Sequence, residues 1–330
     1  MTVRSPRRWR PSLPREPGAA GAYLRLLGAS LAWGGGAIAV KYAVLALPPV
    51  AMAFARYLIA VAILAALLAL TRRRWPRRDD LPLLFLLGLT GVFGFAVPFN
   101  AGLQFTGAGE GSVLTAISPF VSFLFAAWLL GDRLTARRLV AGGISLGGVA
   151  VLVSGGPPAT AISPNRVLGD LLVLIAAVNW GVYSVLVRLI QQRGVELLAM
   201  TTWSMIIGVA LMALALPFEP RPIVWQALGP DVLAAVLYAG LVSSVLAYLW
   251  WNESVRRIGP ARASLFTNLN PVVAVVIAAV LFGEWFTPLQ AAGAALVIAG
   301  LVIANLPSRQ RPAPPHDAAS SATVTCRSSA

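Results

Sequence analysis

Charged residues are scarce in this chain: only 12% of its 330 residues are Asp, Glu, Lys or Arg, whereas 58% are hydrophobic. A soluble domain has about 25% charged and about 45–50% apolar residues. Apolar runs of about 20 residues recur along the whole length, and this is the length that a helix needs to cross a bilayer. The composition therefore excludes a soluble enzyme, a disordered chain and a collagen-like fibre. Because the runs also lack the alternation of a transmembrane barrel, we predict an all-α membrane protein with several spans.

Cysteine and histidine are almost absent as well. The single cysteine, Cys326, and the single histidine, His316, both lie in the polar C-terminal tail. This excludes a disulfide framework and a thiolate metal site. No Gly-rich loop ending in Lys-Ser/Thr is present to bind ATP. We therefore expect no metal, no cofactor, no catalytic residue and no direct use of ATP.

Ten transmembrane helices are predicted from hydropathy, with boundaries defined to about 2–4 residues. They lie near residues 24–42, 49–70, 81–101, 110–130, 138–154, 168–189, 197–216, 231–251, 261–282 and 289–306. Short connections that contain Pro and Gly separate them. Residues 1–22 and 307–330 are rich in Pro, Arg, Ser and Ala, and we predict that both segments are disordered tails.

The basic residues set the expected orientation of these spans. The net charge of +14 would suggest nucleic acid in a soluble protein, but here the basic residues fall mostly in tails and short loops, so we expect no nucleic-acid partner. With both tails in the cytoplasm, 22 basic residues lie inside and three outside (Lys41, Arg166 and Arg221), as the positive-inside rule requires. An alternative is a signal peptide cleaved near Ala39, with Arg7-Arg8 as a twin-arginine signal; the internal repeat disfavours it, because it gives the first span a partner.

The chain contains two related halves. A shift of 147 residues aligns Trp33-Gly34 with Trp180-Gly181 and Lys41 with Arg188. A shift of 152 residues aligns Asn100 with Asn252, Gly107 with Gly259, Thr115 with Thr267, Pro119 with Pro271, Gly131 with Gly283, Asp132 with Glu284, and Thr135 with Thr287. Each half holds five spans, an odd number, so the architecture is two inverted five-helix repeats. Such repeats are typical of secondary transporters, which bind substrate near the midplane between the halves; the alternative is an old duplication kept for packing alone.

These repeated motifs resemble the EamA family of drug/metabolite transporters. The resemblance rests on Trp-Gly in the first span of each half, on Ser118-Pro119 with Gly131-Asp132, and on Asn270-Pro271 with Gly283-Glu284. It covers residues 24–306, with repeats at 24–154 and 168–306, and departs from the family only in having Asp132 where Glu is usual. The resemblance implies a ten-helix carrier of the bacterial inner membrane, often an exporter of amino acids or other metabolites. It leaves the cargo undefined.

Arg56 is the first candidate substrate-binding residue. It lies in an otherwise apolar span, about 10 Å from the outer end at about 1.5 Å per residue. A charge at such a depth costs at least about 2.5–3.5 kcal/mol and usually faces a cavity or a partner. We predict that Arg56 binds a carboxylate or phosphate of the substrate; the alternative is a side chain that reaches back to the outer lipid headgroups. The repeat-related residue is Trp203, so the charge is not a symmetric feature.

Two prolines are expected to break their helices at the midplane. Pro119 and Pro271 each free the carbonyl four residues earlier, on Thr115 and Thr267. Irregular backbone with free carbonyl groups persists in a bilayer only where protein or water forms hydrogen bonds with it. The polar side chains beside these breaks are therefore candidates for a substrate-binding wall, with hydrogen bonding between helices as the alternative. They are Ser118, Asn268 and Asn270.

Aromatic and small residues complete the prediction. Substrate contact or close packing is expected of Trp33 and Trp180, with Asn179 and Tyr183 nearby. Residues of the interfacial aromatic belt are expected near the end of span 8, at Tyr248, Trp250 and Trp251. Helix–helix contacts are expected at the glycines of spans 5 and 10, namely Gly143, Gly147, Gly293 and Gly300.

The acidic residues lie at span ends, in loops or in tails, and Glu110 is the nearest to a span interior. Because proton relays use acids or histidine within the membrane, the sequence leaves proton coupling, exchange and facilitated diffusion open. We predict a secondary transporter with a small-molecule substrate and membrane lipid as partners, and the family resemblance implies export as the direction. Uptake, a structural or lipid-scrambling protein, and a membrane-embedded enzyme are the alternatives, and the oligomeric state, including a homodimer, is left open.

Overall fold

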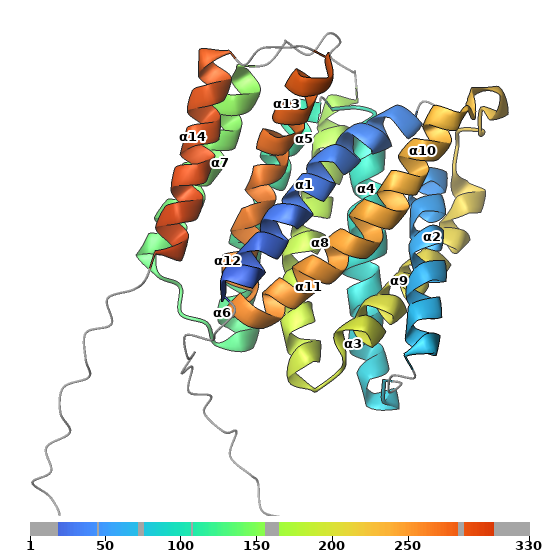
Figure 1. The fold of residues 1–330 in the computed structure, drawn as a ribbon, viewed down its shortest axis with the longest axis horizontal. Helices are drawn as coiled ribbons and strands as arrows, with labels where there is room; N and C mark the ends of the chain where they lie inside the picture. The colour runs from blue at the N-terminus through green and yellow to red at the C-terminus, as the bar shows by residue number, and fades with distance from the viewer. Residues whose placement is uncertain are drawn as a thin grey trace, which may run out of the picture.

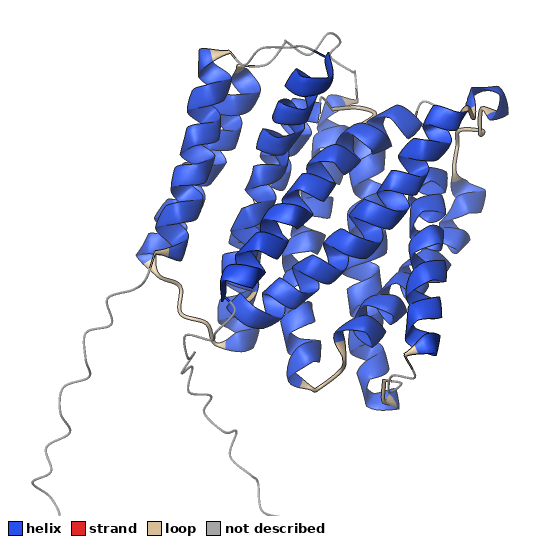
Figure 2. Ribbon diagram, viewed as in Figure 1, coloured by secondary structure: helices blue, strands red, loops and turns tan. Residues whose placement is uncertain are grey.

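The computed structural model describes residues 19–44, 46–71, 76–106, 108–155, 165–282 and 287–306, and this part of the chain consists of helices joined by turns and short loops (Figure 2). Residues 1–18 and 307–330 of the predicted tails lie outside it, as do Gly107, the Gly283-Glu284 pair and the side chains of Lys41 and Glu110. The first helix begins at Ala19. It therefore includes the last four residues that the sequence assigns to the N-terminal tail.

Nine helical segments in the described residues are long and apolar enough to cross a membrane. They are Ala20–Val40, Pro49–Leu70, Arg78–Gly102, Val113–Leu130, Ala136–Ser154, Arg166–Gln192, Leu197–Phe218, Pro230–Ile258 and Pro288–Asn305. Between the last two, α12 (Pro260–Ala263), a 3-10 segment (Ser264–Asn268) and α13 (Leu269–Phe282) follow one another without a gap. This run corresponds to the ninth predicted span, and the predicted ten-helix fold is confirmed.

The helices divide into two inverted sets of five spans. The first set is α1 (Ala19–Ala43), α2 (Pro49–Leu70), α3 (Leu81–Gly88) with α4 (Gly94–Gly102), α5 (Ala108–Thr115) with α6 (Ser118–Leu130), and α7 (Ala136–Ser154). The second set is α8 (Arg166–Gln192), α9 (Leu197–Ala215), α10 (Pro230–Tyr238) with α11 (Ala247–Ile258), α12 with α13, and α14 (Pro288–Asn305). Helix α1 begins and α14 ends on one face of the bundle, the lower one in Figure 1. We call it the terminal face and the opposite one the far face.

The third span of each set contains a π-helical segment. The two segments are Leu89–Phe93, between α3 and α4, and Ala239–Leu246, between α10 and α11. The repeat shift of 152 residues places the first within the second. In the second segment the Ser244 hydroxyl donates to the carbonyl of Ala239, five residues earlier, at 2.9 Å, which matches the i to i+5 spacing of a π-helical turn. The two repeats therefore share a local distortion that hydropathy does not reveal.

A buried asparagine anchors this third span to the second span of the same set. Asn100 Nδ2 donates to the carbonyl of Pro49 at 3.2 Å, and Asn252 Nδ2 donates to Thr201 Oγ1 at 3.0 Å. Both donors and both acceptors are related by the same shift of 152 residues. Each bond is buried, where a polar group without a partner would be costly. The contact repeats although the acceptor changes from backbone to side chain.

Helices α7 and α14 pack against each other along their length at one edge of the bundle (Figure 1). Small residues allow this approach: a Cβ atom on Gly148 would lie 2.6 Å from Val297 N, and one on Gly300 would lie 2.6 Å from the Ala141 carbonyl oxygen. A Cβ atom on Gly293 would lie 2.5 Å from Leu152 Cα. The sequence prediction is wrong for Gly143 and Gly147, since a Cβ on either would meet no atom within 4 Å.

Candidate functional site

A cavity of about 130 Å³ lies between the two repeats. Its lining comes from α1, α2, α4, α5, α6, α8, the π-helical segment Ala239–Leu246, α11, the 3-10 segment and α13. The lining residues are Trp33, Gly36, Ala37, Val40, Arg56, Phe95, Phe99, Asn100, Thr115, Ser118, Ala177, Trp180, Ser243, Tyr248, Thr267, Asn270, Pro271 and Ala274. On α1, which begins at the terminal face, the lining residues lie in the second half of the helix. The cavity is therefore displaced toward the far face.

A cluster of aromatic rings closes the cavity toward the terminal face. Trp33 on α1 and Trp180 on α8, which the repeat relates to each other, meet edge to face with ring centroids 5.2 Å apart. Tyr248 lies edge to face against both of them at 6.0 and 5.6 Å, and Trp251 lies 5.4 and 5.3 Å from them. Trp33 Nε1 donates to the carbonyl of Ser243 at 3.0 Å, which ties α1 to the π-helical segment. The inverted repeats thus meet at a group of packed rings, Trp33, Trp180, Tyr248 and Trp251, which we call the aromatic layer.

Arg56 lies in the cavity wall at one end of a chain of hydrogen bonds. Its Nη2 donates to the Tyr57 hydroxyl at 2.8 Å, and the hydroxyls of Tyr57 and Tyr248 are 2.7 Å apart. The Tyr248 hydroxyl donates to the carbonyl of Gly91 at 2.7 Å, so the proton between the two tyrosines belongs to Tyr57. All three bonds therefore run in one direction, from the guanidinium to a carbonyl in the first π-helical segment. Bonds aligned in this way polarise one another.

The two predicted helix breaks lie in the cavity wall beside each other. Helix α5 ends at Thr115 and α6 begins at Ser118, while the 3-10 segment ends at Asn268 and α13 begins at Leu269. Thr267 donates to the carbonyl of Ser264 at 2.6 Å, so Ser118 is the donor in its 3.4 Å contact with the Thr267 hydroxyl. This contact joins the two repeats at their related helix breaks.

The structure places some of the predicted site residues in the cavity wall and others away from it. Trp33, Arg56, Ser118, Trp180, Asn270 and Pro271 line the cavity. Three predicted site residues, and with them Pro119, do not belong to the lining. Asn268 donates to Ser145 on α7 at 3.0 Å, Tyr183 donates to Asn252 at 2.9 Å, and Asn179 donates to the carbonyl of Ile175 in its own helix at 2.8 Å. The first two side chains connect different elements of the bundle, and for Asn268 this is the alternative that the sequence left open.

Sequence reasoning misplaced Tyr248 and Trp251. The expected aromatic belt assumed that span 8 ends near residue 251, but α11 continues to Ile258. Tyr248 and Trp251 are therefore in the interior, 2% and 1% exposed, and Tyr248 lines the cavity. Phe95, Phe99 and Ser243 were missed as well. The only sequence signal near them was the pairing of Asn100 with Asn252.

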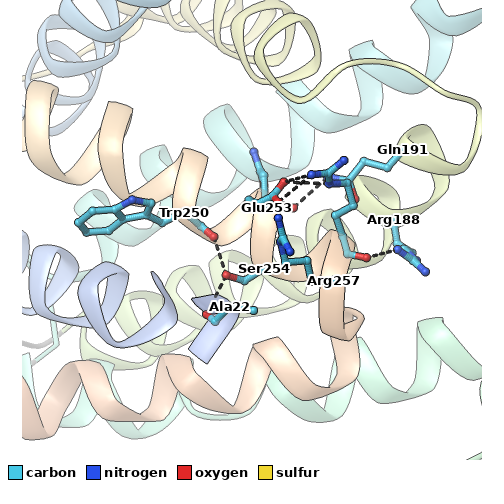
Figure 3. A network of polar contacts seen from close by, with 9 residues as sticks. Ala22, Arg188, Gln191, Trp250, Glu253, Ser254 and Arg257 are labelled. Atoms are coloured by element: carbon cyan, nitrogen blue, oxygen red, sulfur yellow. Dashed lines mark hydrogen bonds and ion pairs between the residues drawn. The ribbon is translucent and has the colours of Figure 1, made fainter. Parts of the chain in front are cut away.

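Polar contacts link α1, α8 and α11 on the terminal side of the aromatic layer. Figure 3 shows this network from close by. Glu253, 8% exposed, accepts hydrogen bonds from Arg256 and Arg257. Between helices, Arg188 on α8 donates to the carbonyl of Arg256, and Gln191 donates to the carbonyl of Asn252 at 2.9 Å. Ser254 donates to the carbonyl of Ala22 on α1 at 3.0 Å. Helices α1, α8 and α11 are thus joined on the terminal side of the cavity.

Asp132 lies in the loop after α6, outside the cavity wall. Partial burial raises the pKa of its carboxyl, while the nearby guanidinium groups of Arg138, Arg188 and Arg262 oppose that rise. The acid therefore sits among arginines. Among the described residues that line the cavity, Arg56 is the only charged one.

Comparisons with known proteins agree with this architecture. The model of the EamA-like transporter family matches residues 20–154 and again residues 167–306. A solved crystal structure superposes with a TM-score of 0.73 at 25% sequence identity and covers 87% of this chain and 97% of that one.

Several curated proteins are similar over most of their length. An uncharacterized transporter of Bacillus subtilis, YyaM, is 30% identical over 285 residues, which are 86% of this chain and 93% of that protein. A probable terminal-alkyne amino-acid exporter of Streptantibioticus cattleyicolor is 34% identical and covers 75% of this chain and 80% of its own. A probable amino-acid metabolite efflux pump of Salmonella typhimurium is 29% identical, with 82% and 90% covered. With the family model matched across both five-helix repeats, the chain belongs to the EamA-like transporter family, as a multi-pass membrane transporter.

Proposed function

We propose that this protein is a secondary carrier, not an enzyme, and that it exports an amino acid or a related small metabolite across the bacterial inner membrane. The observation that supports this proposal most strongly is the cavity between the inverted repeats, with aromatic, polar and cationic side chains in its wall. Two relatives are named as exporters of amino acids or their metabolites. In the proposed orientation both termini lie in the cytoplasm, so the terminal face is the cytoplasmic one.

The size of the cavity favours a small cargo. Pockets for drug-sized ligands have volumes of about 300–1,000 Å³, whereas this cavity has about 130 Å³. An amino acid with a modest side chain is closer to that volume than a typical drug is. The apolar part of the wall, including Phe95 and Phe99, would contact the side chain of such a cargo.

Transport requires the cavity to open alternately to each side. The terminal face is closed by the aromatic layer and by the polar contacts between α8 and α11. Loading from the cytoplasm therefore requires these contacts to separate, and the repeats to rock against each other as in other carriers with inverted repeats. The shared π-helical segments and the helix breaks are positions at which such a movement can bend the spans.

An efflux screen tests the proposal. Cells that lack the protein and cells that overproduce it are loaded with candidate amino acids and with toxic amino-acid analogues, and solute export and growth are measured. We expect overproduction to lower the intracellular level of at least one of these solutes and to protect against its toxic analogue. Increased accumulation of a solute would instead support uptake. No change for any solute, with the protein present in the membrane, would contradict the proposal.

A further inference from the structure

Three buried polar atoms in the cavity wall have no hydrogen-bond partner among the residues that the structure describes. They are Arg56 Nε, Trp180 Nε1 and Asn270 Oδ1. The large majority of buried polar atoms in proteins are paired with protein or water, so each exception calls for an explanation. These three atoms belong to residues of both repeats that face one cavity. A ligand that offers an acceptor to Arg56 Nε and a donor to Asn270 Oδ1 explains two of them together.

The first of these atoms specifies an anionic group. The Arg56 guanidinium can only donate hydrogen bonds. Its Nη2 donates to the Tyr57 hydroxyl, and its buried Nε has no partner among the described residues. No acidic side chain is found among the described residues of the cavity wall. A guanidinium in a partly buried site needs an anion, and its planar fork matches a carboxylate. The chain of tyrosine hydroxyls holds the guanidinium in place for it.

The third atom specifies a hydrogen-bond donor. Asn270 Oδ1 can only accept, so its partner in the ligand must be an N–H or O–H group. The wall offers neutral groups for this donor, since Ser118 and Thr267 line the cavity beside the helix breaks. A protonated amine and a hydroxyl can both satisfy an amide oxygen. A keto group cannot.

Most of the remaining wall is apolar or aromatic, including Phe95, Phe99, Trp33 and Trp180. Asn100, Thr115 and Ser243 also line it. We propose that the cavity binds a small monocarboxylate that carries a hydrogen-bond donor next to its carboxylate and an apolar remainder. Arg56 binds the carboxylate, and Asn270 accepts from the donor. Amino acids and 2-hydroxy acids with apolar side chains satisfy this description, whereas amines without a carboxylate and 2-keto acids do not. This inference rests on the proposed function and adds the chemistry by which the cargo is recognised.

Direct binding to the purified full-length protein tests this inference separately from transport. Four probes that share the isobutyl side chain of leucine are titrated while tryptophan fluorescence is followed, because Trp33 and Trp180 line the cavity. The probes are leucine, 2-hydroxyisocaproate, 2-ketoisocaproate and isoamylamine. We expect leucine and the hydroxy acid to bind within about threefold of each other, and the keto acid and the amine to bind at least about tenfold more weakly, since an unpaired buried group forfeits roughly that factor.

Variants of Asn270 test whether its side-chain oxygen accepts the hydrogen bond from the ligand's donor. In Asn270→Leu, the preference for the hydroxy acid over the keto acid should fall to about onefold, whereas Asn270→Asp keeps an acceptor and should keep the preference. Because the readout is a ratio within one protein, a general loss of stability does not produce it. The inference is overturned if the amine binds as well as leucine, if the keto acid equals the hydroxy acid, if the ratio survives in Asn270→Leu, or if no probe binds. The efflux screen can still succeed in each of these cases, so failure here is distinct from failure of the proposed function.

Discussion

Replacing Arg56 tests the electrostatic part of the site most sharply. Hydrogen bonds to charged groups contribute about 1.5–3 kcal/mol each, whereas a neutral replacement contributes about 0.5–1.5 kcal/mol. Arg56→Gln loses the charge and at least one bond of the fork, so we expect transport efficiency to fall by about 2–4 kcal/mol, or about 30- to 1,000-fold. Arg56→Lys keeps the charge, but its single ammonium must serve both the ligand and the Tyr57 hydroxyl, which Arg56 Nη2 contacts at 2.8 Å. A smaller loss of about tenfold is expected for Lys.

The assay is the initial rate of efflux at a low solute concentration, divided by the amount of protein inserted in the membrane. This normalisation separates a transport defect from poor insertion. A side chain that only reaches the lipid headgroups would behave differently: Lys would work as well as Arg, and Gln would lower the amount of protein without changing the rate per molecule. Equal rates per molecule for Arg, Lys and Gln would remove Arg56 from the site and favour a neutral or cationic cargo.

Three further predictions follow from other parts of the fold. Tyr57→Phe and Tyr248→Phe should each raise KM about three- to tenfold, and the double variant should lose little more, because both break the same chain of hydrogen bonds; additive losses in a double-mutant cycle would count against the chain. Gly148→Ala should lower the melting temperature in detergent, because its Cβ would press on the α14 backbone, whereas Gly147→Ala points into open space and should not. A reporter fused after residue 310 should be active in the cytoplasm and one inserted at Thr160 should face outward, and a cytoplasmic Thr160 would overturn the ten-span orientation.

The architecture could be predicted from the sequence because its signals are long and repeated. A span of about 20 apolar residues is visible in any window, and the paired motifs around Pro119 and Pro271 place the two halves in register. Span 8 shows that the end of a helix is harder to predict from hydropathy than its presence. Polar residues near its end, from Asn252 to Arg257, resemble a loop, but α11 continues to Ile258. Asn252 bonds to Thr201 on α9, and Glu253 pairs with Arg256 one turn further along the same helix.

Hydropathy could not predict the direction in which each side chain points from its helix. Asn268 and Asn270 are two residues apart at the same helix break, yet Asn268 donates to Ser145 while Asn270 lines the cavity. Gly147 and Gly148 differ by one position, and only Gly148 faces α14. A rotation of about 100° per residue decides each outcome, and an apolar helix surrounded by lipid and protein has no polar face from which to read that rotation.

Substrate protection of an introduced cysteine shows whether the cargo occupies the cavity between the repeats. Cys326→Ser removes the single native cysteine, and Ala37→Cys then places a thiol in the cavity wall. Tyr42→Cys, on the same helix but outside the lining, is the matched control. We predict that a solute identified by the efflux screen slows labelling of Ala37→Cys by a water-soluble thiol reagent and leaves Tyr42→Cys unchanged. Equal labelling of Ala37→Cys with and without that solute, in protein that still transports it, would contradict the account.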